Sequence, residues 1–190
     1  MPASQGTLAA PGPAGFMRYD AVAIAFHWLM FALIAVAYAT VELRDLADKG
    51  TVARMVFMEA HKWSGALVLA LAVPRLLWRL MRGAPPPEPG PRLGLLASAA
   101  VHGLLYVFLF AEPILGIVMS NAGGRLLTVP LLGIELPPVV APDPVLKDMV
   151  ADIHETLGKA FYLVIGLHAM AALFHHYMLG DNTMRRMKRR

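Results

Sequence analysis

The sequence has 190 residues, of which 57% are hydrophobic and only 16% are charged, and its mean hydropathy is +0.57. A soluble domain has about 45–50% apolar and about 25% charged residues, so this composition disfavours a soluble globular fold. The absence of cysteine excludes disulfides, thiolate catalysis, Cys-ligated zinc, iron–sulfur clusters and covalently attached haem. The net charge of +4 comes largely from a basic C-terminal tail, which indicates membrane orientation rather than nucleic-acid binding.

The N-terminal part combines a short leader with a first apolar segment. Residues 1–15 are rich in Pro, Gly and Ala and predict a disordered leader. The segment 21–41 has no charged residue and lies between Asp20 and Glu42. It is long enough to span a membrane, since about 20 apolar residues cross a hydrocarbon layer of about 30 Å. A cleaved signal peptide fits poorly, because residues 1–17 contain no Lys or Arg.

Three further apolar segments predict membrane helices over about 56–79, 93–119 and 153–179. The second is the weakest, because only 63–74 is free of charge. It reaches full length if Lys62, Arg75 and Arg79 extend their charged ends toward the head groups; a buried or re-entrant helix is the alternative. We therefore expect an all-α integral membrane four-helix bundle over residues 16–187, followed by a basic tail at 188–190.

The charges predict the orientation of this bundle. With four spans, the two termini and the second connection share one side, which has three acidic residues and ten basic ones, namely Arg18, Arg75, Arg79, Arg82, Arg92, Arg185, Arg186, Lys188, Arg189 and Arg190. The other side has seven basic and nine acidic residues, leaving out the intramembrane Glu112. Because basic loops stay in the cytoplasm, both termini are expected there. The longest loop, 120–150, is then outside.

Seven histidines need an explanation, because ionisable residues inside a membrane are costly and are usually functional. His154 and His168 are 14 residues apart in the fourth predicted helix, so they lie about 21 Å apart on nearly the same face. His27 in the first span lies toward the cytoplasmic side, at the depth of His168. His61 in the second span lies toward the outer side, at the depth of His154.

Two pairs of histidines at two depths suit several kinds of site. Bis-imidazole ligation of two b-type haems requires this arrangement and favours electron transfer over oxygen binding. A zinc site needs three or four ligands at one depth, and Asp152 and Glu155 lie near the outer pair in sequence, so zinc stays open. A proton relay of histidines is the other alternative.

Several segments resemble the bacterial cytochrome b-561 family. They are RYDAVAIAFHWLM (18–30), HKWSGALVLALAVPRLLWRL (61–80), HGLLY (102–106), DIHETLG (152–158), GLHAMAALFHHYMLGD (166–181) and TMRRM (183–187). The resemblance implies a four-helix bundle in the bacterial inner membrane that holds two non-covalent b haems. It implies His27 and His168 as axial ligands of the inner haem, and His61 and His154 as those of the outer haem.

Two residues need separate treatment. The family is usually apolar just before the proline of the third helix, whereas this chain has Glu112 before Pro113; Glu112 is interpreted as a proton donor or as an outer-leaflet residue that reaches the interface. His102 has a depth that would suit the inner haem. The resemblance favours a hydrogen bond to a haem propionate or to another helix for it.

The resemblance also implies two functions. Some relatives resemble superoxide oxidases, which pass electrons from superoxide at the outer face to ubiquinone. Others resemble haem-bearing membrane subunits that exchange electrons with a partner dehydrogenase or hydrogenase. We favour the first, since no long soluble docking extension is expected. The outer charge is slightly negative overall, so steering of superoxide is expected only from a local patch of Arg54, Lys62 and Arg125.

Overall fold

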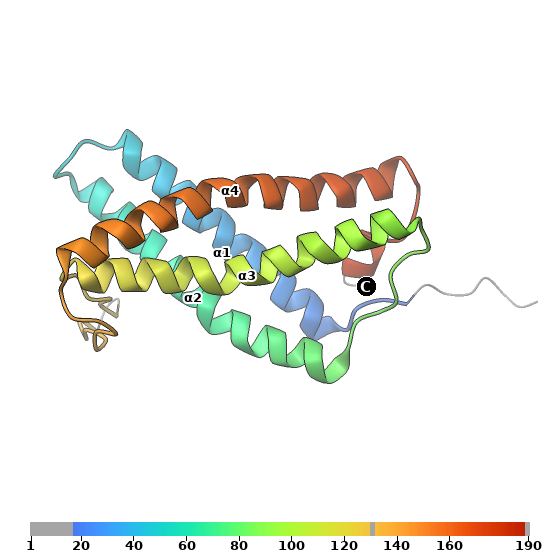
Figure 1. The fold of residues 1–190 in the computed structure, drawn as a ribbon, viewed down its shortest axis with the longest axis horizontal. Coiled ribbons are helices and arrows are strands. Elements are labelled where there is room, and N and C mark those ends of the chain that lie inside the picture. Colours follow the sequence, from blue (N-terminus) through green and yellow to red (C-terminus); the bar gives the residue numbers. More distant parts are fainter. Residues whose placement is uncertain (1–16, 130–131, 189–190) are drawn as a thin grey trace, which may run out of the picture.

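The computed structural model describes residues 17–129 and 132–188. They form four long helices, α1 (Ala21–Leu46), α2 (Val52–Arg82), α3 (Arg92–Ala122) and α4 (Pro144–Tyr177), and a short 3-10 turn η1 (Arg185–Met187) (Figure 1). All four helices are long and apolar enough to cross a membrane. The predicted leader 1–15 and the last two residues of the predicted basic tail lie outside the described residues.

Each helix differs in its ends from the apolar segment that predicted it. The fourth begins at Pro144 rather than near 153, because Asp143 caps it by accepting hydrogen bonds from Val145 and Leu146, and it ends at Tyr177 rather than 179. Thr51 likewise caps α2 at its start. Polar caps of this kind let a helix continue past the apolar stretch that sequence hydropathy detects.

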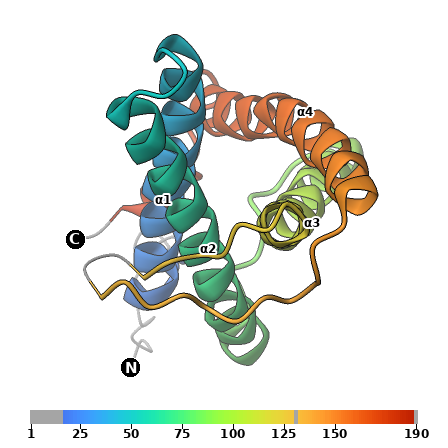
Figure 2. The ribbon, with the colours of Figure 1, turned by 90° about the vertical axis from the view of Figure 1, so that its left-hand side faces the viewer.

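The helices pack as two hairpins joined along α2 and α3. The close contacts run between α1 and α2, between α3 and α4, and between α2 and α3, whereas α4 approaches only α3 closely (Figure 2). The apolar core joins the first three helices through Met30, Val68, Ala72 and Leu109. Only 6–17% of the residues in the most apolar stretch of each helix are buried, so most of this apolar surface is left for lipid or a bound group to cover.

An aromatic stack joins α3 to α4 near the middle of the bundle. Phe108 of α3 lies over Phe161 of α4 with ring centroids 4.2 Å apart, and both side chains are buried. Phe161 is seven residues from both His154 and His168, so it lies on nearly the same face of α4, midway between them.

The two ends of the bundle differ in their connections (Figure 1). At one end, here the loop end, lie the turn 47–51 and the loop 123–143. At the other, here the basic end, lie residues 17–20, the connector 83–91 and the segment 178–188. The segment 178–188 packs against the basic end of the bundle. There the Trp28 indole donates to the Met187 carbonyl at 2.9 Å, and Arg186 pairs with Glu88 at 2.9 Å.

Asp20 ties the first two helices together at the basic end. Its carboxylate accepts hydrogen bonds at 3.0 Å from the backbone of Val22 and Ala23, and from the Trp78 indole of α2. Partial burial raises the pKa of Asp20, but these hydrogen bonds outweigh it and hold the pKa below its ordinary value of 3.8. The carboxylate therefore stabilises the fold above that pH, and this stabilisation is lost as the pH falls through the lower pKa of the folded state.

We expect Asp20→Ala to lower the free energy of unfolding by about 1 kcal/mol at pH 7, because helix α1 loses its cap. Asp20→Asn is the matched control, since an amide oxygen still caps the helix but does not titrate. Unfolding in detergent at pH 7 and pH 3 measures both. The capping role is contradicted if both variants lose the same free energy of unfolding at pH 7. It is also contradicted if the difference in this free energy between wild type and Asp20→Ala is as large at pH 3 as at pH 7.

Candidate functional site

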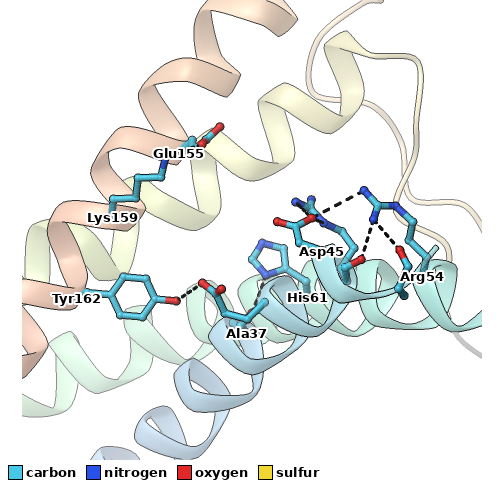
Figure 3. Close-up of polar contacts among 10 residues, drawn as sticks. Ala37, Asp45, Arg54, His61, Glu155, Lys159 and Tyr162 are labelled. Atoms are coloured by element: carbon cyan, nitrogen blue, oxygen red, sulfur yellow. Dashed lines mark hydrogen bonds and ion pairs between the residues drawn. The ribbon is translucent and has the colours of Figure 1, made fainter. Parts of the chain in front are cut away.

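The first candidate site lies toward the loop end, between α2 and α4. His61 and His154 face each other with ring centroids 6.2 Å apart and an interplanar angle of 76°. The Nδ1 atom of His61 lies 2.9 Å from the Ala37 carbonyl of α1 (Figure 3). The Nδ1 atom of His154 lies 2.9 Å from Oε2 of Glu112. Each Nδ1 thus has a neighbour outside the pair, which leaves Nε2 of each ring as the nitrogen that could bind a ligand.

The second candidate site lies toward the basic end, between α1 and α4. His27 and His168 have ring centroids 6.2 Å apart and an interplanar angle of 63°. His102 of α3 lies 5.2 Å from His168, but its Nδ1 atom contacts the Ser98 carbonyl of its own helix at 2.7 Å. The bond expected for His102, to a haem propionate or to another helix, stays a prediction.

The ring spacing in both pairs suits one metal ion between two imidazoles. A metal–imidazole bond is about 2 Å long and the nitrogen lies about 1 Å from its ring centroid, so rings on opposite sides of one ion have centroids about 6 Å apart. Among residues 17–129 and 132–188, no group of three or more His, Asp or Glu side chains is placed to hold a metal ion. This disfavours the zinc alternative and fits an axial pair that completes the coordination of a planar cofactor.

Helix spacing gives these pairs room. The histidines face each other across α1–α4 and α2–α4, which are the helix pairs that do not pack closely. Gly65 follows His61 by one turn of α2 and has open space where a Cβ would stand. Gly116 of α3 has the opposite role, because a Cβ there would lie 3.4 Å from Cε1 of His154. Helix α3 therefore supports the back of the His154 ring, while the opposite side stays open.

A cation lies beside the second pair. Arg75 of α2 is half-buried, contacts the sulfur of Met30 at 3.7 Å and lies 5.9 Å from the centre of the Tyr106 ring. Within the described part of the chain, no carboxylate is in ion-pair distance of Arg75, and its Nε has no hydrogen-bond partner. Arg75 therefore places a positive charge inside the bundle at this level.

The three predicted steering cations lie at the loop end but differ in their surroundings. Lys62 pairs with Glu59 at 2.5 Å, and its side chain is only 18% exposed. Arg54 donates to the Arg44 and Ala47 carbonyls at the end of α1 (Figure 3). Arg125 is exposed, in the part of the loop that the Trp63 indole holds down by donating to the Thr128 carbonyl at 2.9 Å. Of the three, Arg125 is the most available to an anion in solution.

Two tyrosines link α1 to α4 on the loop-end side of the His27–His168 pair. The Tyr38 hydroxyl donates to the Gly158 carbonyl at 2.8 Å, and the Tyr162 hydroxyl donates to Glu42 at 2.8 Å (Figure 3). Their rings lie 4.1 Å apart. These bonds hold two helices together that have little direct packing, and nothing in the sequence pattern indicated them.

The fold and these cross-helix histidine pairs define a membrane four-helix bundle of the cytochrome b type. The family model described as "Prokaryotic cytochrome b561" matches residues 18–190. The chain is therefore a member of the prokaryotic cytochrome b561 family, a family of membrane electron-transfer proteins that bind b-type haem. The predicted resemblance is thereby confirmed, as is the all-α membrane bundle.

Individual relatives match over nearly the whole chain. "Cytochrome b561 homolog 1" of Escherichia coli K12 is 34% identical over 171 residues, covering 90% of this chain and 96% of its own. "Probable superoxide oxidase CybB" of Yersinia pestis is 34% identical over 172 residues, covering 90% and 95%. "Cytochrome b562" of Cereibacter sphaeroides is 26% identical over 175 residues, covering 90% and 95%.

We expect Tyr38→Phe to lower the free energy of unfolding in detergent by about 0.6–1.7 kcal/mol, which is the range for an interhelical hydrogen bond in a membrane. Tyr162→Phe is the comparison, since its hydroxyl is the more exposed of the two and should matter less. A Tyr38→Phe variant as stable as wild type would show that packing alone holds α4 at this level.

Proposed function

We propose that the chain is a di-haem b-type cytochrome that transfers electrons across the bacterial inner membrane. In this proposal His61 and His154 hold one non-covalent haem near the loop end, and His27 and His168 hold the other near the basic end. The observation that carries it is the repetition of one geometry at two depths, with ring centroids 6.2 Å apart in both pairs. When bound, the two haems supply reversible one-electron chemistry at both membrane surfaces.

In this proposal, residues of the protein orient the haem ligands and neutralise a haem carboxylate. Contacts to the Nδ1 atoms of His61 and His154 orient the two rings toward each other. Arg75 supplies the positive charge that a haem carboxylate requires inside the bundle, near the His27–His168 pair. Two histidines would hold each haem, and such a haem would supply electron transfer rather than oxygen activation.

The overall reaction proposed is superoxide oxidation by ubiquinone. Two superoxide anions lose one electron each at the loop end and leave as two dioxygen molecules, and one ubiquinone takes up two electrons and two protons to become ubiquinol. The support is the 34% identity to a protein named as a probable superoxide oxidase, together with the exposed Arg125 at the loop end. The excess of basic residues at the other end supports a cytoplasmic location of both termini.

One observation favours a second function. The loop 123–143 exposes large apolar side chains, including Leu132, Ile134 and Val139, which are 57–69% exposed. Such a surface suits contact with a protein as well as with lipid. The alternative is therefore a haem-bearing membrane subunit that exchanges electrons between a partner dehydrogenase or hydrogenase and quinone.

We expect two b haems per chain, visible in the reduced-minus-oxidised spectrum of the purified protein and extractable without covalent cleavage. His61→Ala or His154→Ala should remove one spectral component, and His27→Ala or His168→Ala the other. His102→Ala is the control and should retain both, since its Nδ1 is engaged by its own helix. If His102→Ala removes a spectral component and His27→Ala does not, the assignment of His27 rather than His102 as a ligand is wrong.

Superoxide generated enzymatically should reduce the haems and yield quinol in the purified protein. Arg125→Glu should slow this reaction more than Lys62→Glu does, because Glu59 already compensates Lys62, and the effect should grow at low salt. Lys147→Glu makes the same charge change at the same end of the bundle and is the control. Haems that stay oxidised under superoxide but reduce with quinol or a partner dehydrogenase support the second function.

A further inference from the structure

Glu112 of α3 is a carboxylate inside the membrane, at the back of the His154 ring. Its Oε2 atom lies 2.9 Å from Nδ1 of His154, which has no hydrogen-bond partner among the described residues, and the side chains of Glu112 and His154 are only 14% and 20% exposed. Its other oxygen, Oε1, is buried and has no hydrogen-bond partner among the described residues. Hydrocarbon surroundings make such a carboxylate costly, so its contact with one particular imidazole needs a reason.

The helices are shaped to bring the two side chains together. Gly116 lies one turn after Glu112 on α3, and Gly158 lies one turn after His154 on α4. A Cβ at 116 would lie 3.4 Å from the His154 ring, and one at 158 would lie 3.7 Å from Oε2 of Glu112. Both distances are ordinary van der Waals contacts, so the two side chains lie against the facing helices at these glycines, where α3 and α4 pack closely.

We infer that Glu112 is a positioning residue that acts through His154 and lowers the reduction potential of the haem that His61 and His154 would hold near the loop end. A carboxylate at the Nδ1 side of a metal-bound imidazole orients the ring and strengthens it as a donor. A stronger donor and a nearby negative charge both favour ferric over ferrous iron. The inference rests on the proposed ligation of that haem by His61 and His154.

The two ligands of this haem then differ in character. Nδ1 of His61 contacts the neutral Ala37 carbonyl at 2.9 Å, whereas Nδ1 of His154 meets a carboxylate. At the His27–His168 level, no described Asp or Glu forms an ion pair with either ring. The carboxylate is therefore specific to one of the two sites, and it separates their potentials in the direction that makes the loop-end haem the harder one to reduce.

The test is a redox titration of Glu112→Gln, which keeps the shape of the side chain and removes its charge. We expect the ferric-to-ferrous ratio of the loop-end component to fall at least about tenfold at a fixed potential, an upward shift of about 59 mV for a one-electron couple. That component is identified as the one that His61→Ala lacks. The other component should not move, and helical content by circular dichroism should match wild type.

The matched control is Glu155→Gln. It removes the same charge beside His154 in sequence, but its side chain is 69% exposed and pairs with Lys159 at 2.6 Å (Figure 3). Selective loss of the loop-end haem in Glu112→Gln, with helicity intact, also supports the positioning role. Equal shifts for the two variants, no shift, or loss of both haems overturns it. If the wild type binds two haems and Glu112→Gln leaves the potential of the loop-end component unchanged, this inference alone is wrong. If the wild type binds no haem, the proposed function is wrong as well.

Discussion

An imidazole ring inside a membrane needs a partner for each of its nitrogens, and this need organises the whole bundle. Nδ1 of His61 meets it with the Ala37 carbonyl, whereas Nδ1 of His154 lies 2.9 Å from Glu112 without a hydrogen bond among the described residues. Helix α4 accordingly stands apart from α1 and α2 and packs closely only against α3. The bundle is therefore dense on one side, through Met30, Val68 and Leu109, and spaced for a cofactor on the other.

The two ends of the bundle differ in their polar contacts and in their exposed side chains. The basic end is closed by short polar ties, among them the Arg186–Glu88 ion pair and the bond from Trp28 to the chain near its C-terminus. The loop end carries a long connection with exposed apolar side chains, fixed at Thr128 by the Trp63 indole. The surface at the loop end is therefore built differently from the surface at the basic end.

Hydropathy and helix depth predicted the four helices and the partners of His27 and His61, because span order alone decides which histidines share a leaflet. The helix ends were missed at α4, since Asp143 extends it beyond the apolar stretch. The contact between Glu112 and His154 was also missed. It depends on how α3 and α4 are rotated against each other, and no periodicity in one helix reports that rotation. The pairing of Lys62 with Glu59 is different, because the two residues lie three apart on α2 and helical spacing alone indicates it; this pairing leaves Arg125 as the most exposed of the three predicted steering cations.

Along α4, His154, Phe161 and His168 follow one another at seven-residue intervals on nearly one face, with Phe161 stacked on Phe108 between them. The length of this segment is therefore constrained as strongly as the identity of its residues. One inserted or deleted residue would rotate the two imidazoles by about 100° relative to each other and leave one of them facing lipid. The same spacing also places Gly158 and Tyr162, which lie between the histidines, at their hydrogen bonds with Tyr38 and Glu42 of α1.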